Sequence, residues 1–71
     1  MVALGSDLRA ARLRRGLELE EVAEQTRISR RYLRALEEER FELLPGDAYA
    51  KSFLRSYADY LGLDARMFAD E

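Results

Sequence analysis

Apolar side chains recur every three or four residues along most of the chain, which is the spacing that places them on one side of an α-helix. Only one proline and four glycines interrupt this pattern. The spacing predicts five helices, at about residues 8–15, 19–25, 30–38, 47–61 and 64–70. We therefore expect an all-α fold, and a length of 71 residues limits it to a single domain over residues 1–71.

Residues that favour helix ends stand at most of the expected boundaries. The candidate N-caps are Ser6 or Asp7, Ser29, Asp47 and Asp64. Gly16 and Gly62 stand where a left-handed residue commonly ends a helix, and Leu63 is placed to make the apolar contact that accompanies such an end. Pro45 and Gly46 predict a turn before the fourth helix.

The second and third helices read as a helix-turn-helix unit. The short turn Thr26-Arg27-Ile28 separates them, and Ile28 is an apolar residue inside that turn. Leu33 and Leu36, three positions apart, point inward together from the third helix. Two short helices joined by such a turn form the unit found in phage repressors. We place its core at about residues 8–39.

The composition removes the residues that most catalytic and metal sites need. The chain has no cysteine and no histidine, so the commonest general base, the commonest metal ligand and any thiolate are absent. No apolar run approaches the roughly 20 residues that span a bilayer. We therefore expect a soluble, non-enzymatic binding domain without a cofactor, a metal or a small-molecule substrate.

Two longer patterns make the chain resemble a known family. The first half carries G-L-x-x-E-E-V-A, I-S, Y-L and L-E at the spacing of phage-repressor-like DNA-binding domains. The second half reads L-P-x-x-x-Y-A-x-x-F-L-R-S-Y-A-x-x-L-G-L-D, which is more specific. From about residue 8 to residue 68 the chain resembles the N-terminal cytoplasmic helix-turn-helix domain of the RodZ family of bacterial cell-shape proteins. It departs from the family at Glu18, a poor N-cap where members usually have Ser or Thr.

The resemblance implies a five-helix domain whose partner is the bacterial actin MreB, gripped mainly through the fourth helix. It also implies that the chain is a fragment of a longer membrane-anchored protein, in which a linker, one transmembrane helix and a periplasmic domain follow. The domain would then lie at the cytoplasmic face of the bacterial inner membrane. Another cytoskeletal or divisome protein is an alternative partner for the same surface.

A helical wheel separates two apolar stripes on the fourth helix. With Tyr49 set at 0°, Phe53, Ser56 and Tyr60 all fall within about 40° of it. The core stripe falls between about 80° and 140° and contains Ala50, Leu54, Tyr57 and Leu61. We call Tyr49, Phe53, Ser56 and Tyr60 the aromatic face. Rigid aromatic side chains suit a protein interface, because they bring a large contact area at little cost in entropy.

The aromatic face leads to a hypothesis about the partner contact. Tyr49 and Phe53 are expected to lead the contact with MreB, and Ser56 and Tyr60 to lie at its margin. The alternative is that Tyr49 or Phe53 fills the gap under the turn at residues 43–45 and belongs to the core.

The third helix supports a rival function. Four arginines crowd its N-terminal half, namely Arg27, Arg30, Arg31 and Arg34. This element enters the major groove in helix-turn-helix proteins, and arginine is the commonest reader of guanine. The alternative is therefore a sequence-specific DNA-binding domain of a repressor-like transcription regulator.

The charge balance weighs against DNA. Phosphate neutralisation supplies much of the affinity of DNA-binding proteins, yet residues 1–40 carry nine basic side chains against eight acidic ones. The other interpretation of the arginines is a solvated face paired with neighbouring glutamates, for example Arg34 with Glu38.

Overall fold

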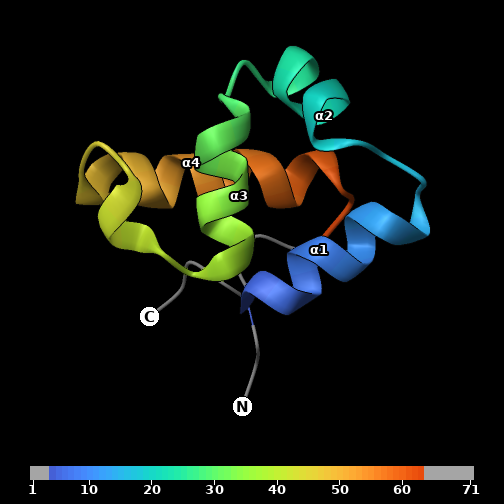
Figure 1. The fold of residues 1–71 in the computed structure, drawn as a ribbon, viewed down its shortest axis with the longest axis horizontal. Coiled ribbons are helices and arrows are strands. Elements are labelled where there is room, and N and C mark those ends of the chain that lie inside the picture. The colour runs from blue at the N-terminus through green and yellow to red at the C-terminus, as the bar shows by residue number, and fades with distance from the viewer. Residues whose placement is uncertain (1–3, 64–71) are drawn as a thin grey trace.

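The computed structural model describes residues 4–63. Within this range the chain forms four α-helices and one short 3₁₀ helix, shown in Figure 1: α1 (Leu4–Arg14), α2 (Leu19–Thr26), α3 (Arg30–Glu38), η1 (Phe41–Leu43) and α4 (Asp47–Tyr60). The described part contains no strand, so its all-α class is confirmed. The fifth helix expected at residues 64–70, with its candidate cap Asp64, lies outside the described residues.

Helix α3 stands at the centre of the fold. It packs against α1, α2, η1 and α4, and in Figure 1 it crosses in front of α4. Side chains from every α-helix meet in one core, whose largest fully buried members are Leu8, Val22, Leu33, Leu36 and Tyr57. Because each of the other helices packs against α3, this helix determines which face of each of them is buried.

The helix-turn-helix unit is confirmed as α2, a short turn and α3. Ile28 is buried beneath the turn as predicted, and the Thr26 hydroxyl accepts from the Ile28 amide at 3.2 Å. Arg27 takes the left-handed conformation that ends α2. Ser29 caps α3 by accepting a hydrogen bond from the Tyr32 amide at 3.3 Å. Glu18 precedes α2 without a side-chain capping bond, in agreement with its poor capping ability.

Two helices end as their glycines predict. Gly16 and Gly62 both have positive φ, and in each case the next residue donates from its amide back into the last turn. The Leu17 amide contacts the Arg12 carbonyl at 3.1 Å, and the Leu63 amide contacts the Ala58 carbonyl at 2.8 Å. These bonds satisfy carbonyls that would otherwise lack a partner at the helix end.

The N-caps predicted for the first and fourth helices are wrong. Helix α1 begins at Leu4, so Ser6 and Asp7 lie inside it and cap nothing. Its first turn is held by a contact distant in sequence, because the Gly5 amide donates to the Glu39 carboxylate at 2.8 Å. Asp47 is the first residue of α4, and the N-cap is Gly46, which has no side chain to cap with. Asp47 therefore acts as an acidic residue in the first helical turn.

Candidate protein-interaction face

Burial around α4 follows the predicted wheel. Of the predicted core stripe Leu54, Tyr57 and Leu61 are buried and Ala50 is half-buried, and Ala58, which lies outside that stripe, is buried as well. On the opposite side Lys51, Arg55 and Asp59 are all exposed. The aromatic face lies between these two sides, where it is open to a partner without being separate from the core.

The four residues of the aromatic face differ in their exposure. Tyr49 is 54% exposed and Ser56 is exposed as well. Phe53 and Tyr60 are half-buried and pack against the core. Of the two residues that the alternative assigns to the core, Phe53 packs against it, whereas about half of the Tyr49 side chain is exposed.

The Phe53 ring pairs with two tyrosine rings. Tyr32 of α3 stacks on it, with 5.6 Å between the ring centroids and 23° between the planes. The centroid of the Tyr49 ring also lies 5.6 Å from that of Phe53, with a tilt of 44° between the planes. Both geometries fall within the range of favourable aromatic pairs. The stack joins α3 to α4 and holds Tyr49 at its outer end.

Tyr60 lies at the far end of the same face. It is eleven residues beyond Tyr49, which corresponds to about 16 Å along a helix axis. The aromatic pairs within residues 4–63 join Tyr49, Phe53 and Tyr32 but do not include Tyr60. The structure thus brings together the two residues expected to lead a contact and leaves Tyr60 at a distance.

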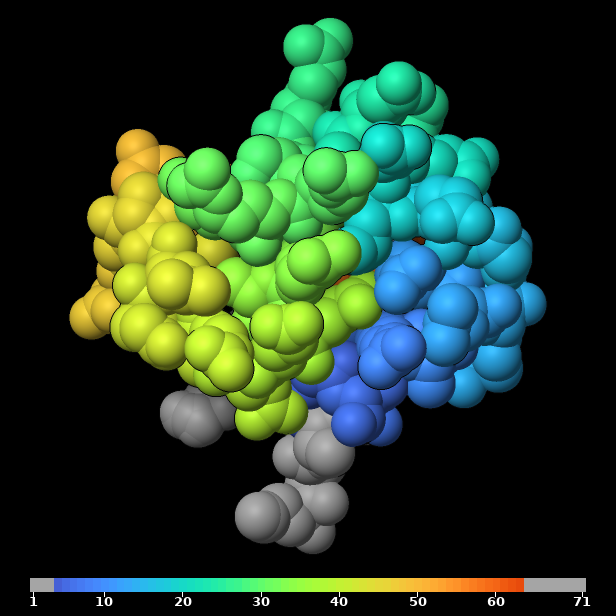
Figure 2. Space-filling model, viewed as in Figure 1, coloured from blue at the N-terminus to red at the C-terminus, as the bar shows by residue number. Residues whose placement is uncertain are grey.

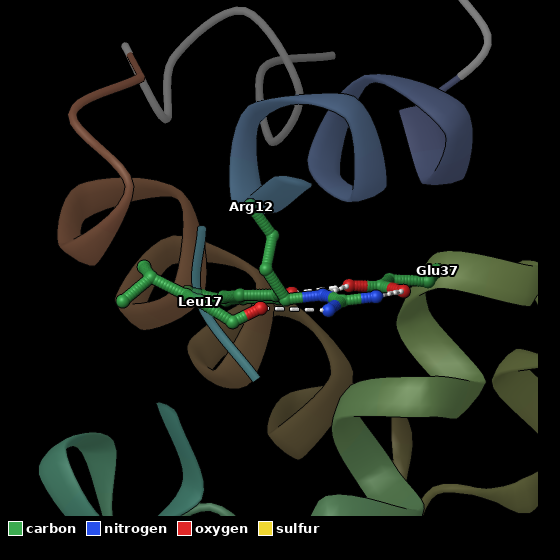
Figure 3. A network of polar contacts seen from close by, with 4 residues as sticks. Arg12, Leu17 and Glu37 are labelled. Atoms are coloured by element: carbon green, nitrogen blue, oxygen red, sulfur yellow. Dashed lines mark hydrogen bonds and ion pairs between the residues drawn. The ribbon is translucent and has the colours of Figure 1, made fainter. Parts of the chain in front are cut away.

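A buried polar network holds α4 in place behind this face (Figure 3). The Arg12 guanidinium donates to Glu37 from Nε at 2.7 Å and from Nη2 at 3.2 Å, and from Nη1 to the Leu17 carbonyl at 2.9 Å. The Tyr57 hydroxyl donates to the same Glu37 carboxylate. One side chain from each of α1, α3 and α4 therefore meets at a single point.

The network shifts two pKa values. Burial, the hydrogen bond to Glu37 and its negative charge together raise the pKa of Tyr57 well above its ordinary value of 10.0. The hydrogen bond to Glu37 and its charge also raise the pKa of Arg12, against the opposing effect of burial. Tyr57 therefore stays neutral and Arg12 stays charged throughout the physiological range, so the network is a fixed structural element.

The arginines of the rival hypothesis form an exposed surface on α3 and the turn before it. Arg27, Arg30, Arg31 and Arg34 are all exposed. Arg30 is neutralised by Glu20 of α2 at 2.9 Å, in a pair where both side chains are open to solvent. The expected pairing of Arg34 with Glu38 is wrong, because Glu38 instead contacts Arg40 at 3.7 Å. This surface is therefore mixed in charge at its α2 side.

Sequence reasoning overlooked three aromatic or aliphatic residues near the aromatic face. Tyr32 is the inner ring of the stack, and its position four residues before the buried Leu36 was the available signal. Phe41 and Leu43 of η1 are exposed. No periodic pattern exists over so short an element to show which way these two side chains point.

The described residues offer little to a metal ion. Within residues 4–63 no group of three or more acidic, histidine or cysteine side chains lies close enough together to hold one.

No helix among the described residues has the length and apolar character needed to cross a membrane.

The sequence of the chain is similar to one protein family and to two known proteins. Residues 7–68 match a family described as "Helix-turn-helix domain". The chain is 39% identical over 67 residues to "Cytoskeleton protein RodZ" of Streptococcus pneumoniae, which covers 94% of this chain and 24% of that protein. It is 38% identical over 55 residues to "Uncharacterized membrane protein YmfM" of Bacillus subtilis, which covers 78% of this chain and 19% of that protein. No solved structure matches the chain.

The relatives are much longer than the chain. It spans about a fifth to a quarter of the length of these two curated proteins. Neither of them is named as an enzyme.

Proposed function

Because the chain belongs to the RodZ family of helix-turn-helix domains, we propose that it is a non-enzymatic domain that binds the bacterial actin MreB through its aromatic face. The observation that carries this proposal is Tyr49, which is 54% exposed yet rests on the Phe53 ring at 5.6 Å. The relative in Streptococcus pneumoniae is named as a cytoskeleton protein, which supports a partner of the cytoskeletal kind.

The stack gives Tyr49 the properties of a binding anchor. Phe53 also pairs with Tyr32 of α3, so the Tyr49 ring packs on a ring that is itself held and loses little freedom on binding. Tyrosine is also among the residues enriched at the energetic centres of interfaces. A partner that covers Tyr49 would gain apolar contact area, and its polar groups could bond the tyrosine hydroxyl or exposed Ser56.

The names of the relatives also support a proposal for the position of the domain in the cell. One relative is named as a membrane protein and the other as a cytoskeleton protein. We propose that the domain lies at the cytoplasmic face of the bacterial inner membrane, as part of a longer membrane-anchored protein. Binding MreB there would hold the filament next to the membrane and serve cell shape.

The direct test is co-sedimentation of the 71-residue chain with polymerised MreB at several salt concentrations. The proposal predicts that the chain pellets with filaments and stays in the supernatant without them. If the chain stays in the supernatant at every salt concentration, binding to MreB by this domain is wrong.

A second candidate function is sequence-specific DNA binding through α3, with the domain serving a transcription regulator. Its supporting observation is that Arg31 and Arg34 are exposed and form no ion pair within residues 4–63. Arg30, in contrast, is already paired with Glu20. A titration with duplex DNA tests it, because phosphate contacts make affinity fall steeply with salt. Absence of binding at low salt would exclude this function.

A further inference from the structure

Tyr32 is held in place by the helix-turn-helix unit. Its amide lies 3.3 Å from the Ser29 hydroxyl and 3.0 Å from the Ser29 carbonyl oxygen, so the first turn of α3 fixes its backbone. The next residue, Leu33, is fully buried, and the Tyr32 side chain is half-buried against the core. Tyr32 therefore has a defined position before any partner binds.

The direction of the Tyr32 side chain differs from that of the arginines around it. At 100° per residue Tyr32 lies about 40° from buried Leu36, whereas Arg30 and Arg34 each lie about 160° from it. Both arginines are exposed, while the Tyr32 ring stacks on Phe53 of α4. In Figures 1 and 2 the start of α4, yellow to orange, lies at the left edge of the molecule beside α3, which is green. Tyr32 thus connects the helix-turn-helix unit to the aromatic face.

The Phe53 ring lies between this fixed residue and Tyr49 in the sequence of contacts. Tyr49 and Phe53 are four residues apart, and a pair with this spacing in an isolated helix contributes less than the thermal energy. That pair alone would leave several rotamers open to the Tyr49 side chain. Phe53 is restrained, however, because it also stacks on Tyr32. A restrained Phe53 favours the Tyr49 rotamer that packs on it, with the centroids 5.6 Å apart.

The other surroundings of the Tyr49 ring restrain it little. The residue is 54% exposed. Toward the start of α4 its Cδ2 lies 3.7 Å from the position that a Cβ would take on Gly46, where no side chain is present. Within residues 4–63 the aromatic partner of Tyr49 is Phe53. The rotamer of Tyr49 therefore depends on how firmly Phe53 is held.

We propose that Tyr32 is a positioning residue for the contact with MreB, and that it acts on Tyr49 through Phe53 without touching the filament. This inference rests on the proposed function and deepens it, because it makes the affinity of α4 depend on a residue of the helix-turn-helix unit. Immobilising one such side chain before binding changes affinity by about two- to tenfold.

The test measures the affinity of matched variants for MreB filaments. Tyr32→Ala is expected to weaken binding by about two- to tenfold, whereas Tyr32→Phe keeps the ring and should bind like the parent chain. Ser29→Ala is the control for stability, because it removes the cap of the same helical turn and leaves the three rings in place. Equal affinities of Tyr32→Ala and Ser29→Ala would overturn the inference.

Circular dichroism checks that each variant is folded. If Tyr32→Ala unfolds, Tyr32→Leu replaces it, since leucine keeps an apolar side chain over the core but removes the ring. The same loss of affinity is expected.

A double-mutant cycle distinguishes positioning from direct contact. In a chain that already carries Tyr49→Ala, adding Tyr32→Ala should change the affinity no further, because the side chain that Tyr32 positions is gone. If Tyr32→Ala weakens binding by the same factor in both backgrounds, Tyr32 contacts the filament itself and the positioning role is wrong.

The rotamer of Tyr49 is measured in the free chain by NMR, through the couplings between its Hα and Hβ protons. We expect one dominant rotamer in the parent and in Tyr32→Phe, and averaged couplings in Tyr32→Ala. Unchanged couplings in Tyr32→Ala would overturn this inference and leave the proposed function standing. If the parent chain does not bind filaments at all, the proposed function fails and this inference fails with it.

Discussion

The guanidinium of Arg12 binds the carboxylate of Glu37 through two hydrogen bonds, of 2.7 Å from Nε and 3.2 Å from Nη2, although the two residues lie 25 positions apart. Both side chains are almost completely shielded from solvent. The Tyr57 hydroxyl donates to the same carboxylate, so one acidic side chain joins three helices. This point ties α4, which carries the aromatic face, to the rest of the fold.

Removal of Glu37 is expected to destabilise the domain strongly. Glu37→Ala should lower the free energy of unfolding by about 3–5 kcal/mol, because it leaves the Arg12 charge buried without a partner. Urea unfolding followed by circular dichroism measures the change. Glu38→Ala is the matched control on the exposed side of α3 and should change the free energy by less than about 0.5 kcal/mol. Equal losses in the two variants would contradict the importance assigned to the network.

Tyr57→Phe isolates the contribution of one hydroxyl. The phenylalanine keeps the buried ring but leaves Glu37 without the third of its hydrogen bonds, so a loss of about 1.5–3 kcal/mol in the free energy of unfolding is expected. Affinity for MreB should stay unchanged once the variant is folded, because Tyr57 is fully buried. A loss of affinity in folded Tyr57→Phe would show that the buried network affects the binding surface.

Alkaline pH is expected to destabilise the domain through Tyr57. Its pKa is raised in the folded state, chiefly by burial and then by Glu37, above the value of about 10 that it has when unfolded. The folded protein therefore keeps a proton that the unfolded chain releases. The contribution of Tyr57 to stability is fully present below about pH 10 and is lost as the pH rises further. Over that range the equilibrium constant for folding falls by up to tenfold per pH unit.

Urea unfolding of the parent chain and of Tyr57→Phe between about pH 9 and 11 measures this effect. The parent should lose more stability than the variant over that range. Parallel losses in both proteins would show that Tyr57 does not cause the pH dependence.

Gly5 is expected to tolerate no side chain. A Cβ at this position would lie 2.1 Å from the Glu37 carbonyl oxygen, so Gly5→Ala must push the start of α1 away from the end of α3. We expect a loss of about 1–3 kcal/mol in the free energy of unfolding, or more if the Glu39 contact breaks as well. Thermal unfolding of the variant checks this, and a stability equal to that of the parent would mean that the two helices do not approach as closely as described.

Local signals made much of the fold predictable from the sequence. Ser29 caps α3 by a hydrogen bond to an amide only three residues further along the chain. Gly16 and Gly62 end their helices because glycine readily adopts positive φ. The wheel of α4 predicted that Tyr57 is buried and that Tyr49 faces another way. Each of these features depends on residues that are close together in the sequence, so the spacing of residue types is enough to predict it.

Contacts between distant residues were not predictable in the same way. The pairing of Arg12 with Glu37 and the bond between Gly5 and Glu39 depend on how α1 meets α3, and periodicity does not encode which polar groups meet. Arg30 likewise has its partner, Glu20, on the preceding helix. At the candidate site, the sequence identified Tyr49 and Phe53 on α4 but not the residues of η1, because three residues are too few to show a period.

The central claim is that the aromatic face of α4 binds MreB, and the most direct measurement compares the affinities of Tyr49→Ala and Leu13→Ala for MreB filaments. The two residues have nearly equal exposure, 54% and 55%, so general loss of exposed apolar area affects both alike. We predict that Tyr49→Ala weakens binding by about fivefold or more, while Leu13→Ala binds like the parent. Equal affinity of the folded Tyr49→Ala variant and the parent chain would contradict the account.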